Sequence, residues 1–114
     1  MQIIDKPITI ESLNTIAQAG FGEMVKAVID VEREIIAIDA ELHSDLEALC
    51  IETGSKQQNL WGINYYPEIA DEDFIEYDSM INMRPSQENK SRGIENDSVR
   101  TKVIEITNKL IKRT

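Results

Sequence analysis

The chain has 114 residues, 41% of them hydrophobic and 29% charged, which is enough for one folded domain with its own core and excludes a disordered chain. Its longest uninterrupted apolar runs are four residues, which excludes a helix that spans a bilayer. The net charge of −9 is concentrated in acidic segments such as 30–47 and 68–78, which would repel a phosphate backbone and so exclude nucleic acid as a partner.

The N-terminus and the cysteine content indicate the compartment. Residues 1–7 lack the basic region, long apolar stretch and small-residue cleavage site of a signal peptide, so we expect the chain in the cytoplasm. Cys50 is the only cysteine and cannot form an internal disulfide. It lies in the apolar run 48–51, and no second histidine is available to activate it. We therefore interpret it as a packed core thiol rather than a nucleophile.

The first predicted element is a short helix. Thr9 precedes the apolar stripe of residues 13–17 and suits an N-cap, because its hydroxyl can accept a hydrogen bond from a free backbone N–H of the first turn. The helix is expected to end near Gly20 or Gly22.

The next two segments have the alternation of strands. Apolar side chains stand at every second position in 24–31 and again in 36–42, and the charged stretch 31–34 suits a turn between them. This spacing predicts a hairpin, although residues 31–38 also fit a helix.

Three further strands are predicted. The apolar segment 46–51 is bounded by polar residues and is followed by a polar turn over 54–59. The aromatic-rich segment 60–66 ends at Pro67, which cannot donate a ladder hydrogen bond. Residues 74–83 alternate once more.

The last predicted element is a longer helix that begins at Asn96 or Asp97. Its apolar side chains recur at helical spacing, at Val99, Val103, Ile106 and Leu110. Such a stripe is ordinary for a helix that lies on a sheet, so it does not by itself indicate a homodimer.

Together these elements predict one α+β domain over residues 1–114. We expect a five-stranded, mainly antiparallel meander sheet, with the short N-terminal helix and the longer C-terminal helix packed on one face. Because an antiparallel sheet can leave its other face in water, the polar side chains of that face are expected to share one open surface. They are Asp39, Glu41, His43, Asn64, Glu76, Asp78 and Asn82.

Several blocks in order also carry a resemblance to a known family. They are MVKAV at 24–28, ELH at 41–43, GSKQ at 54–57, LWGIN at 60–64, DSMIN at 78–82 and RPSQ at 84–87. This succession resembles DUF5674, an uncharacterised family of short prokaryotic proteins, over nearly the whole chain. The resemblance implies a stand-alone domain. It implies no established activity, cofactor or catalytic residue, so cofactors stay unknown.

The loop 84–93 is the foremost candidate site. Three basic residues against Glu88 give it a local charge of +2 in an acidic protein, and the guanidinium groups of Arg84 and Arg92 suit phosphate or carboxylate. The loop also precedes a helix N-terminus, where backbone N–H groups favour negative charge. No glycine-rich phosphate-binding pattern supports a nucleoside triphosphate site. We predict a small anionic ligand bound by Arg84, Ser86, Gln87, Asn89 and Arg92.

That loop also has a purely structural interpretation. Arg84 and Arg92 could instead pair with the protein's own abundant carboxylates and hold a strand-to-helix connection in place.

A second hypothesis is a metal site. Four side chains with oxygen or imidazole ligands alternate along one predicted strand, at Asp39, Glu41, His43 and Asp45. Such ligands suit Mn²⁺, Mg²⁺ or Fe²⁺ better than a structural zinc. Residues on one face of a strand are nearly 7 Å apart, however, so at most two could bind one ion. The alternative is a solvated, charged strand face, and we assign no metal ligand.

His43 supports a third hypothesis, because it is the only histidine and the natural proton carrier near neutral pH. Asp78 or Glu41 could orient it, and Arg84 or Arg92 could stabilise an anion, which would suit a hydrolase. We therefore include His43 and Asp78 among the ligand-binding candidates. The alternative is a hydrogen-bonding histidine on the surface, and whether the protein is an enzyme stays open.

An acidic protein-protein interaction module is the remaining alternative. Aromatic side chains beside charge are typical of interfaces, and Trp61, Tyr65, Tyr66 and Phe74 cluster around the fourth predicted strand. In a domain with so few aromatic residues, the core is expected to use most of them.

Overall fold

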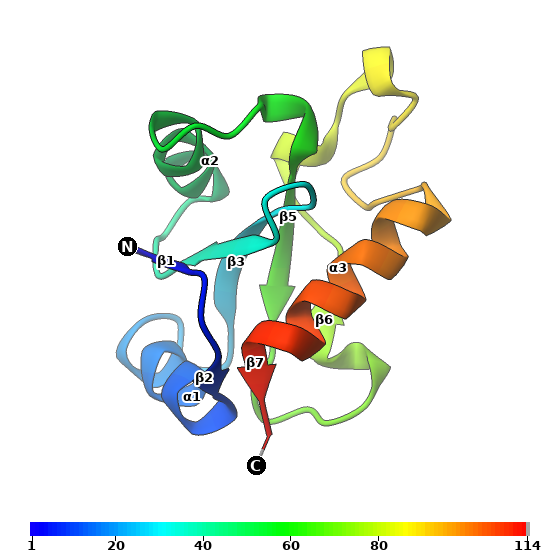
Figure 1. The fold of residues 1–114 in the computed structure, drawn as a ribbon. Helices are drawn as coiled ribbons and strands as arrows, with labels where there is room; N and C mark the ends of the chain where they lie inside the picture. The colour runs from blue at the N-terminus through cyan, green and yellow to red at the C-terminus, as the bar shows by residue number, and fades with distance from the viewer. Residues whose placement is uncertain (114) are drawn as a thin grey trace.

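The computed structural model describes residues 1–113, which form a five-stranded antiparallel sheet, a two-stranded parallel sheet and three α-helices (Figure 1). The five-stranded sheet has the order β1-β4-β3-β5-β6. Its strands are β1 (Gln2–Ile4), β3 (Val25–Asp30), β4 (Ile35–Ile38), β5 (Leu60–Tyr65) and β6 (Ile75–Glu76). The helices are α1 (Ile10–Ala19), α2 (His43–Glu52) and α3 (Asp97–Leu110), and β2 (Ile8–Thr9) pairs with β7 (Ile111–Lys112). The predicted α+β class, with a five-stranded antiparallel sheet and a helix near each end, is confirmed.

Local chemistry explains the elements that the sequence predicted correctly. The Thr9 hydroxyl accepts the Ser12 N–H at 3.1 Å and begins α1, and Asn96 caps α3 in the same way through Val99. In the β3–β4 hairpin, Asp30 Oδ1 accepts the N–H groups of Glu32 and Arg33, the two middle residues of the turn, each at 2.9 Å. These bonds satisfy backbone donors that the ladder leaves free.

The predicted strand over 46–51 is wrong, because these residues belong to α2. Leu46 and Cys50 stand four residues apart, which places both on one side of a helix, and both are fully buried. Burial raises the pKa of the Cys50 thiol to about 11, which disfavours the reactive thiolate. A mostly apolar segment of six residues cannot distinguish a strand from one face of a helix.

Two other strand predictions need correction. The predicted strand 36–42 is β4, and it stops at Ile38 because Asp39 adopts a left-handed conformation with φ of 73°. The predicted strand 74–83 pairs only over Ile75–Glu76, after which the chain turns back as short 3₁₀ segments. The fifth strand of the sheet is β1, which the sequence did not predict.

Because of helix α2, the topology of the sheet differs from the predicted meander. It connects β4 to β5 across β3, so the strands are not in simple meander order. Leu13 of α1 and Val103 of α3 belong to the core on one face of the sheet, and Leu46 and Cys50 of α2 pack on the other. The face that we expected to be open is therefore covered along most of its length. Only the part beyond the N-terminus of α2 stays accessible.

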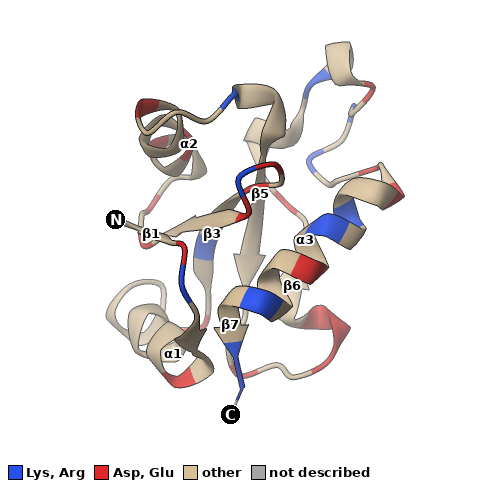
Figure 2. Ribbon diagram, in the orientation of Figure 1, with Lys and Arg blue, Asp and Glu red and all other residues tan. Residues whose placement is uncertain are grey.

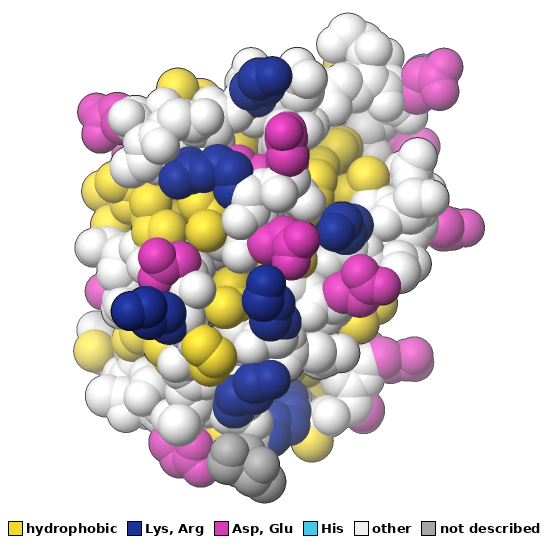
Figure 3. All heavy atoms as spheres, in the orientation of Figure 1, with side chains coloured by type: hydrophobic (Ala, Val, Ile, Leu, Met, Phe, Trp, Pro, Cys, Tyr) yellow, Lys and Arg dark blue, Asp and Glu magenta, His cyan; other side chains and the backbone are white. Residues whose placement is uncertain are grey.

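Charge is distributed unevenly over the fold. Figure 2 shows acidic residues in the loop between β5 and β6 and basic residues along α3 and β7. Opposite charges are interspersed on the face that Figure 3 shows. The Glu34 carboxylate lies 3.5 Å from the Lys102 ammonium and 3.3 Å from that of Lys109, and these ion pairs join the β3–β4 turn to α3. Across residues 1–113, none of the helices combines the length and the apolar character that crossing a bilayer requires.

Candidate functional site

A pocket of about 470 Å³ lies where α2 stops covering the sheet. Its floor is a row of three polar side chains, because Lys26 on β3 stands opposite Asn64 on β5, and Asn64 stands opposite Glu76 on β6. Residues in register on neighbouring strands share one face of the sheet. The strand pairing therefore places a cation, an amide and a carboxylate side by side.

One wall of the pocket is the N-terminus of α2. The N-cap position is Leu42, which has no polar side chain, and within the described residues no side chain caps this helix. His43 opens the helix, and its Nε2 lies 2.8 Å from the Ile63 carbonyl oxygen. A carbonyl only accepts, so Nε2 carries the proton and Nδ1 of the neutral ring is an acceptor. The uncapped helix end presents free backbone N–H groups.

The opposite wall comes from the chain after β6 and from the loop before α3. Arg92 Nε donates to Asp78 Oδ1 at 2.6 Å, and the Ser79 N–H donates to the Arg92 carbonyl at 2.9 Å. The Arg92 side chain is 53% exposed, so this ion pair leaves the rest of its guanidinium accessible to a ligand. The wall thus offers one cation beside one carboxylate.

Asn64 at the floor has an unsatisfied oxygen. Its Nδ2 donates to Glu76 Oε1 at 2.8 Å and lies 3.4 Å from the Asp78 carbonyl oxygen, while its side-chain oxygen Oδ1 meets no donor within residues 1–113. Asn64 is only 5% exposed. Buried polar atoms are rarely left without a partner, so this acceptor marks the floor as a place for a donor.

The model of a protein family described as "Protein of unknown function (DUF5674)" matches residues 2–110. The chain belongs to the DUF5674 family. The match covers nearly the whole chain, and it confirms the resemblance seen in the sequence blocks. No curated protein and no solved structure gives a significant match.

The pocket brings together three of the seven predicted site residues, namely His43, Asp78 and Arg92. Sequence reasoning missed Lys26 as a site residue. The available signal was its position, because Lys26 is a basic residue on the polar side of a strand whose other side is apolar. Its partners across the sheet could not be named without the register.

Arg84 lies outside this pocket, and its guanidinium is used within the DUF5674 domain. It donates to the carbonyl oxygens of Ile81 and Gln57, each at 2.9 Å, and to that of Leu60. The guanidinium also stacks over Trp61, with Cζ of Arg84 4.6 Å from the centroid of the ring. Arg84 therefore fastens the loop to the start of β5, but through backbone carbonyl oxygens and not through the carboxylates of the structural interpretation.

We expect Arg84→Ala to lower the free energy of unfolding by about 2 kcal/mol, because it removes the Arg84 donors to the partly buried carbonyl oxygens of Ile81 and Leu60 and the stacking on Trp61. Urea denaturation measures the change. Lys90→Ala is the control, since Lys90 is an exposed cation of the same loop. An Arg84→Ala variant as stable as the control would contradict this role.

The loop also holds an anion that belongs to the protein itself. The Glu95 carboxylate accepts the backbone N–H groups of Lys90 at 2.6 Å and Ser91 at 2.8 Å, and these bonds lower the pKa of Glu95. Asn89 is buried and donates to the carbonyl oxygens of Asn82 and Gly93 at 2.7 and 2.8 Å. Two backbone N–H groups of this loop are thus already satisfied by Glu95.

The other two predicted loop residues also lie apart from the pocket. Gln87 accepts from Arg84 at 3.1 Å and donates to the Gln58 carbonyl at 3.0 Å, while Ser86 is exposed. Gln87 and Asn89 line a different depression, which also contains Glu88. Of the predicted loop residues, Arg92 alone reaches the pocket.

The structure also bears on the metal-site hypothesis and on the proposed aromatic interface. Asp39 and Glu41 lie in a loop and Asp45 on a helix, so the strand alternation behind the metal site is wrong. Residues 1–113 contain no cluster of three or more His, Cys, Asp or Glu side chains able to hold a metal ion.

The aromatic side chains proposed as interface anchors are mostly buried. Trp61, Tyr65 and Phe74 lie in the core.

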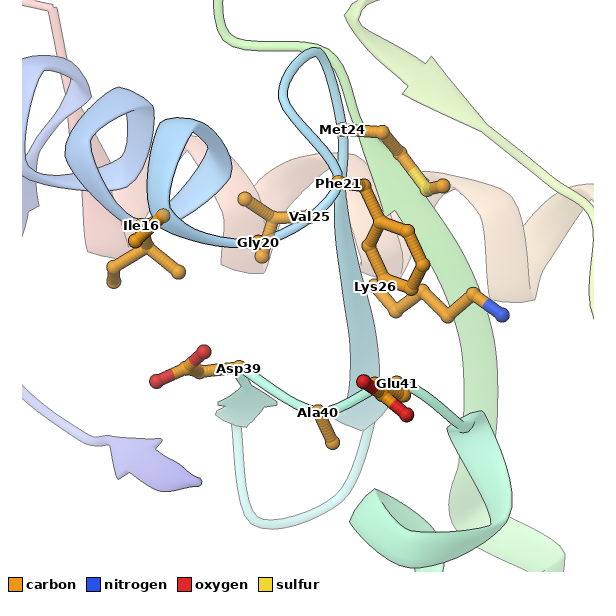
Figure 4. Close-up of a pocket in the computed structure, with 10 residues that line it drawn as sticks. Ile16, Gly20, Phe21, Met24, Val25, Lys26, Asp39, Ala40 and Glu41 are labelled. Atoms are coloured by element: carbon orange, nitrogen blue, oxygen red, sulfur yellow. The ribbon is translucent and has the colours of Figure 1, made fainter.

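A second pocket of about 380 Å³ adjoins the first (Figure 4). Met24 and Lys26 line both. In Figure 4 the Lys26 ammonium points away from Asp39 and Glu41, and its nitrogen lies 5.3 Å from the centroid of the Phe21 ring. The charge of Lys26 is therefore directed away from these carboxylates and remains available to the first pocket.

Burial lowers the pKa of His43 below its ordinary value of 6.5, and the hydrogen bond to Ile63 opposes this in part. Its folded pKa lies below its unfolded one, so the stability that neutral His43 contributes is present above pH 6.5. It is lost as the pH falls from 6.5 through the folded pKa. His43 is the only histidine, so its imidazole signals in an NMR titration report this pKa without ambiguity. A midpoint at or above 6.5 would contradict the prediction.

Proposed function

We propose that this domain binds a small molecule through an anionic group, a carboxylate or a phosphate, in the pocket bounded by Lys26, His43 and Arg92. The observation that carries the proposal is the uncapped N-terminus of α2, which opens into a pocket containing two cations in an otherwise strongly acidic protein. The proposal keeps the anionic ligand predicted from the sequence and moves its site from the loop as a whole to Arg92 and the helix end.

The electrostatics of the helix support this placement. The free N–H groups at the start of a helix carry a partial positive charge and bind anions, and most helices satisfy them with a capping side chain. Leu42 cannot do so. A ligand oxygen at this position would accept from the backbone of His43 and Ser44, while Lys26 and Arg92 would add charge from two sides.

The first experiment is an amide NMR titration of the domain with phosphate, sulfate, acetate, citrate and AMP. Binding is expected to shift the amide signals of residues 42–44 and 92. Lys26→Gln and Arg92→Gln should each weaken binding at least tenfold, because each removes a cation that faces the ligand. Lys90→Gln is the matched control, since it removes an exposed cation near Arg92 that does not line the pocket.

Two results would contradict the proposal. One is a set of shifts that maps to α3 or to the loop around Lys90 instead of the start of α2. The other is binding that Lys26→Gln and Arg92→Gln leave unchanged.

A His43-assisted hydrolase is the second candidate function, and one observation favours it. His43, Asp78 and Arg92 line the same pocket, and the hydrogen bond to Ile63 directs Nδ1 to act as an acceptor. Such a ring could accept a proton from water while Arg92 bound an anionic substrate. Turnover of p-nitrophenyl phosphate or p-nitrophenyl acetate that disappears in His43→Gln would support this activity. Turnover equal in both proteins would contradict it.

A further inference from the structure

We infer that the ligand of this pocket is a zwitterion of α-amino-acid type with an apolar side chain. The inference rests on the proposed function, because it assumes that an anionic group occupies the N-terminus of α2. It adds that the same molecule carries a positively charged donor a few bonds away.

The charge balance of the pocket is the first argument. Lys26 and Arg92 supply two positive charges, and Glu76 and Asp78 supply two negative charges. His43 adds no charge near neutral pH, because burial lowers its pKa. A ligand that was only an anion would meet two carboxylates as well as two cations. A zwitterion would meet an opposite charge at both of its ends.

The unsatisfied oxygen of Asn64 is the second argument, and it is independent of charge. Asn64 Nδ2 faces Glu76 Oε1 and the Asp78 carbonyl oxygen. Turning the amide over would place two acceptors against each other at 2.8 Å, so Oδ1 is fixed in its present position. It is a buried acceptor that has no donor in the neutral state of His43, whose ring lies beside the Asn64 side chain. A ligand ammonium would donate to it and could reach Glu76 as well.

The third argument is the closeness of the two half-sites. His43 at the helix end contacts the carbonyl of Ile63, which is the residue before Asn64. The free N–H groups of α2 and the free acceptor on β5 are therefore neighbours across one pocket. A carboxylate and an ammonium on the same carbon, as in an α-amino acid, match two sites that lie so close together.

The rim of the pocket indicates the side chain. Leu42 is 54% exposed and Met80 is 66% exposed, and both line the pocket together with Met24. Exposed apolar groups around a polar floor are typical of a small-molecule site, in which they cover the apolar part of the ligand. We therefore expect leucine, methionine and related amino acids to bind better than aspartate or lysine.

The test uses three matched probes in amide NMR titrations of the full chain. L-leucine carries both charged groups, 4-methylpentanoate lacks the ammonium, and 3-methylbutylamine lacks the carboxylate. We expect L-leucine to shift the amide signals of residues 42–44 and 64, and each of the two analogues to bind at least tenfold more weakly. The other nineteen amino acids are titrated in the same way.

Glu76→Gln is the discriminating variant. Glutamine keeps an oxygen for Asn64 Nδ2 but loses the negative charge, and Glu76 is exposed, so the fold should persist. The variant is expected to weaken L-leucine binding at least tenfold and to leave 4-methylpentanoate binding unchanged or tighter. Glu72→Gln, which removes an exposed acid outside the pocket, should change neither.

The possible failures separate the two proposals. Equal affinity for L-leucine and 4-methylpentanoate would overturn the zwitterion and leave the anion site in place. Shifts at residues 42–44 with phosphate or acetate but with none of the twenty amino acids would do the same. The absence of shifts at these residues with any probe, including the anions named for the proposed function, would overturn both.

Discussion

Gly62→Ala should be among the most destabilising single substitutions in this domain, with a loss of about 3 kcal/mol or more and a fall in Tm on the order of 12 °C. Gly62 lies in the fully buried strand β5, and a Cβ atom there would lie 2.6 Å from both the Cβ and the Oγ of Ser79. It would also lie 3.1 Å from a carbon of Ile81. The turn after β6 packs directly on the strand backbone, so neither side can yield easily. Thermal denaturation of the purified variant measures the loss.

A double mutant locates the cause of that loss. The clashing atoms belong to the Ser79 side chain, so Ser79→Gly in the Gly62→Ala background should restore part of the stability. Gly93→Ala is the control, because a Cβ there would meet its nearest atom at 3.4 Å, an ordinary contact. If Gly62→Ala were as stable as Gly93→Ala, the close approach of the turn to β5 would be disproved.

Asn82→Ala is expected to cost about 3–5 kcal/mol for a different reason, the loss of buried hydrogen bonds. Asn82 is fully buried, and its amide group pairs with Gly62 as a neighbouring strand would. Its Oδ1 accepts the Gly62 N–H at 2.8 Å, and its Nδ2 donates to the carbonyl oxygens of Gly62 and Arg92, each at 2.9 Å. Alanine would leave the N–H and the carbonyl oxygen of Gly62 without these partners, and would leave the Arg92 carbonyl oxygen with the Ser79 N–H as its donor.

Urea denaturation of Asn82→Ala measures this cost, and Asn82→Asp is the informative companion. Aspartate keeps an oxygen for the Gly62 N–H but at neutral pH cannot donate to the two carbonyl oxygens. We expect it to be destabilised as well, and to regain stability as the pH falls, because the protonated carboxyl group can donate. An Asn82→Asp variant with wild-type stability at neutral pH would show that the amide donor is dispensable.

Both substitutions should also disturb the candidate pocket. Asn82 and Gly62 fasten the segment after β6 to the sheet, and Asn82 holds the Arg92 backbone at the same time. Asp78 and Arg92 form one wall of the pocket through that segment. Gly62 and Asn82 therefore hold a wall of the pocket in position, whereas Lys26, His43 and Arg92 line the pocket itself.

Local patterns were sufficient for the elements that carry their own signals. Thr9 and Asn96 identified the starts of α1 and α3 because capping depends on a side chain and a backbone N–H three residues away. The β3–β4 hairpin followed from the alternation of its strands and its charged turn. Such interactions span a few residues, so the sequence alone reveals them.

Elements that depend on distant partners could not be predicted in this way. The three residues of β1 are a strand only because β4 lies beside them. Helix α2 was mistaken for a strand because its apolar run is too short to show a period. The segment after β6 leaves the sheet because Asn82 takes the place of a strand opposite Gly62, twenty residues away in the chain.

In the candidate site, too, some features follow from the sequence and others depend on distant partners. Residue types and their order were enough to predict an acidic α+β domain and its family, and His43, Asp78 and Arg92 were among the seven candidate site residues. Which of these groups are free could be seen only after the chain was folded. Arg84 and Arg92 are both arginines of one loop, but Arg84 is bound to backbone carbonyls more than twenty residues away, while Arg92 faces a pocket. The residue type sets how many hydrogen bonds a side chain can make. The strand register and the packing around it decide which of its donors and acceptors remain free for a ligand.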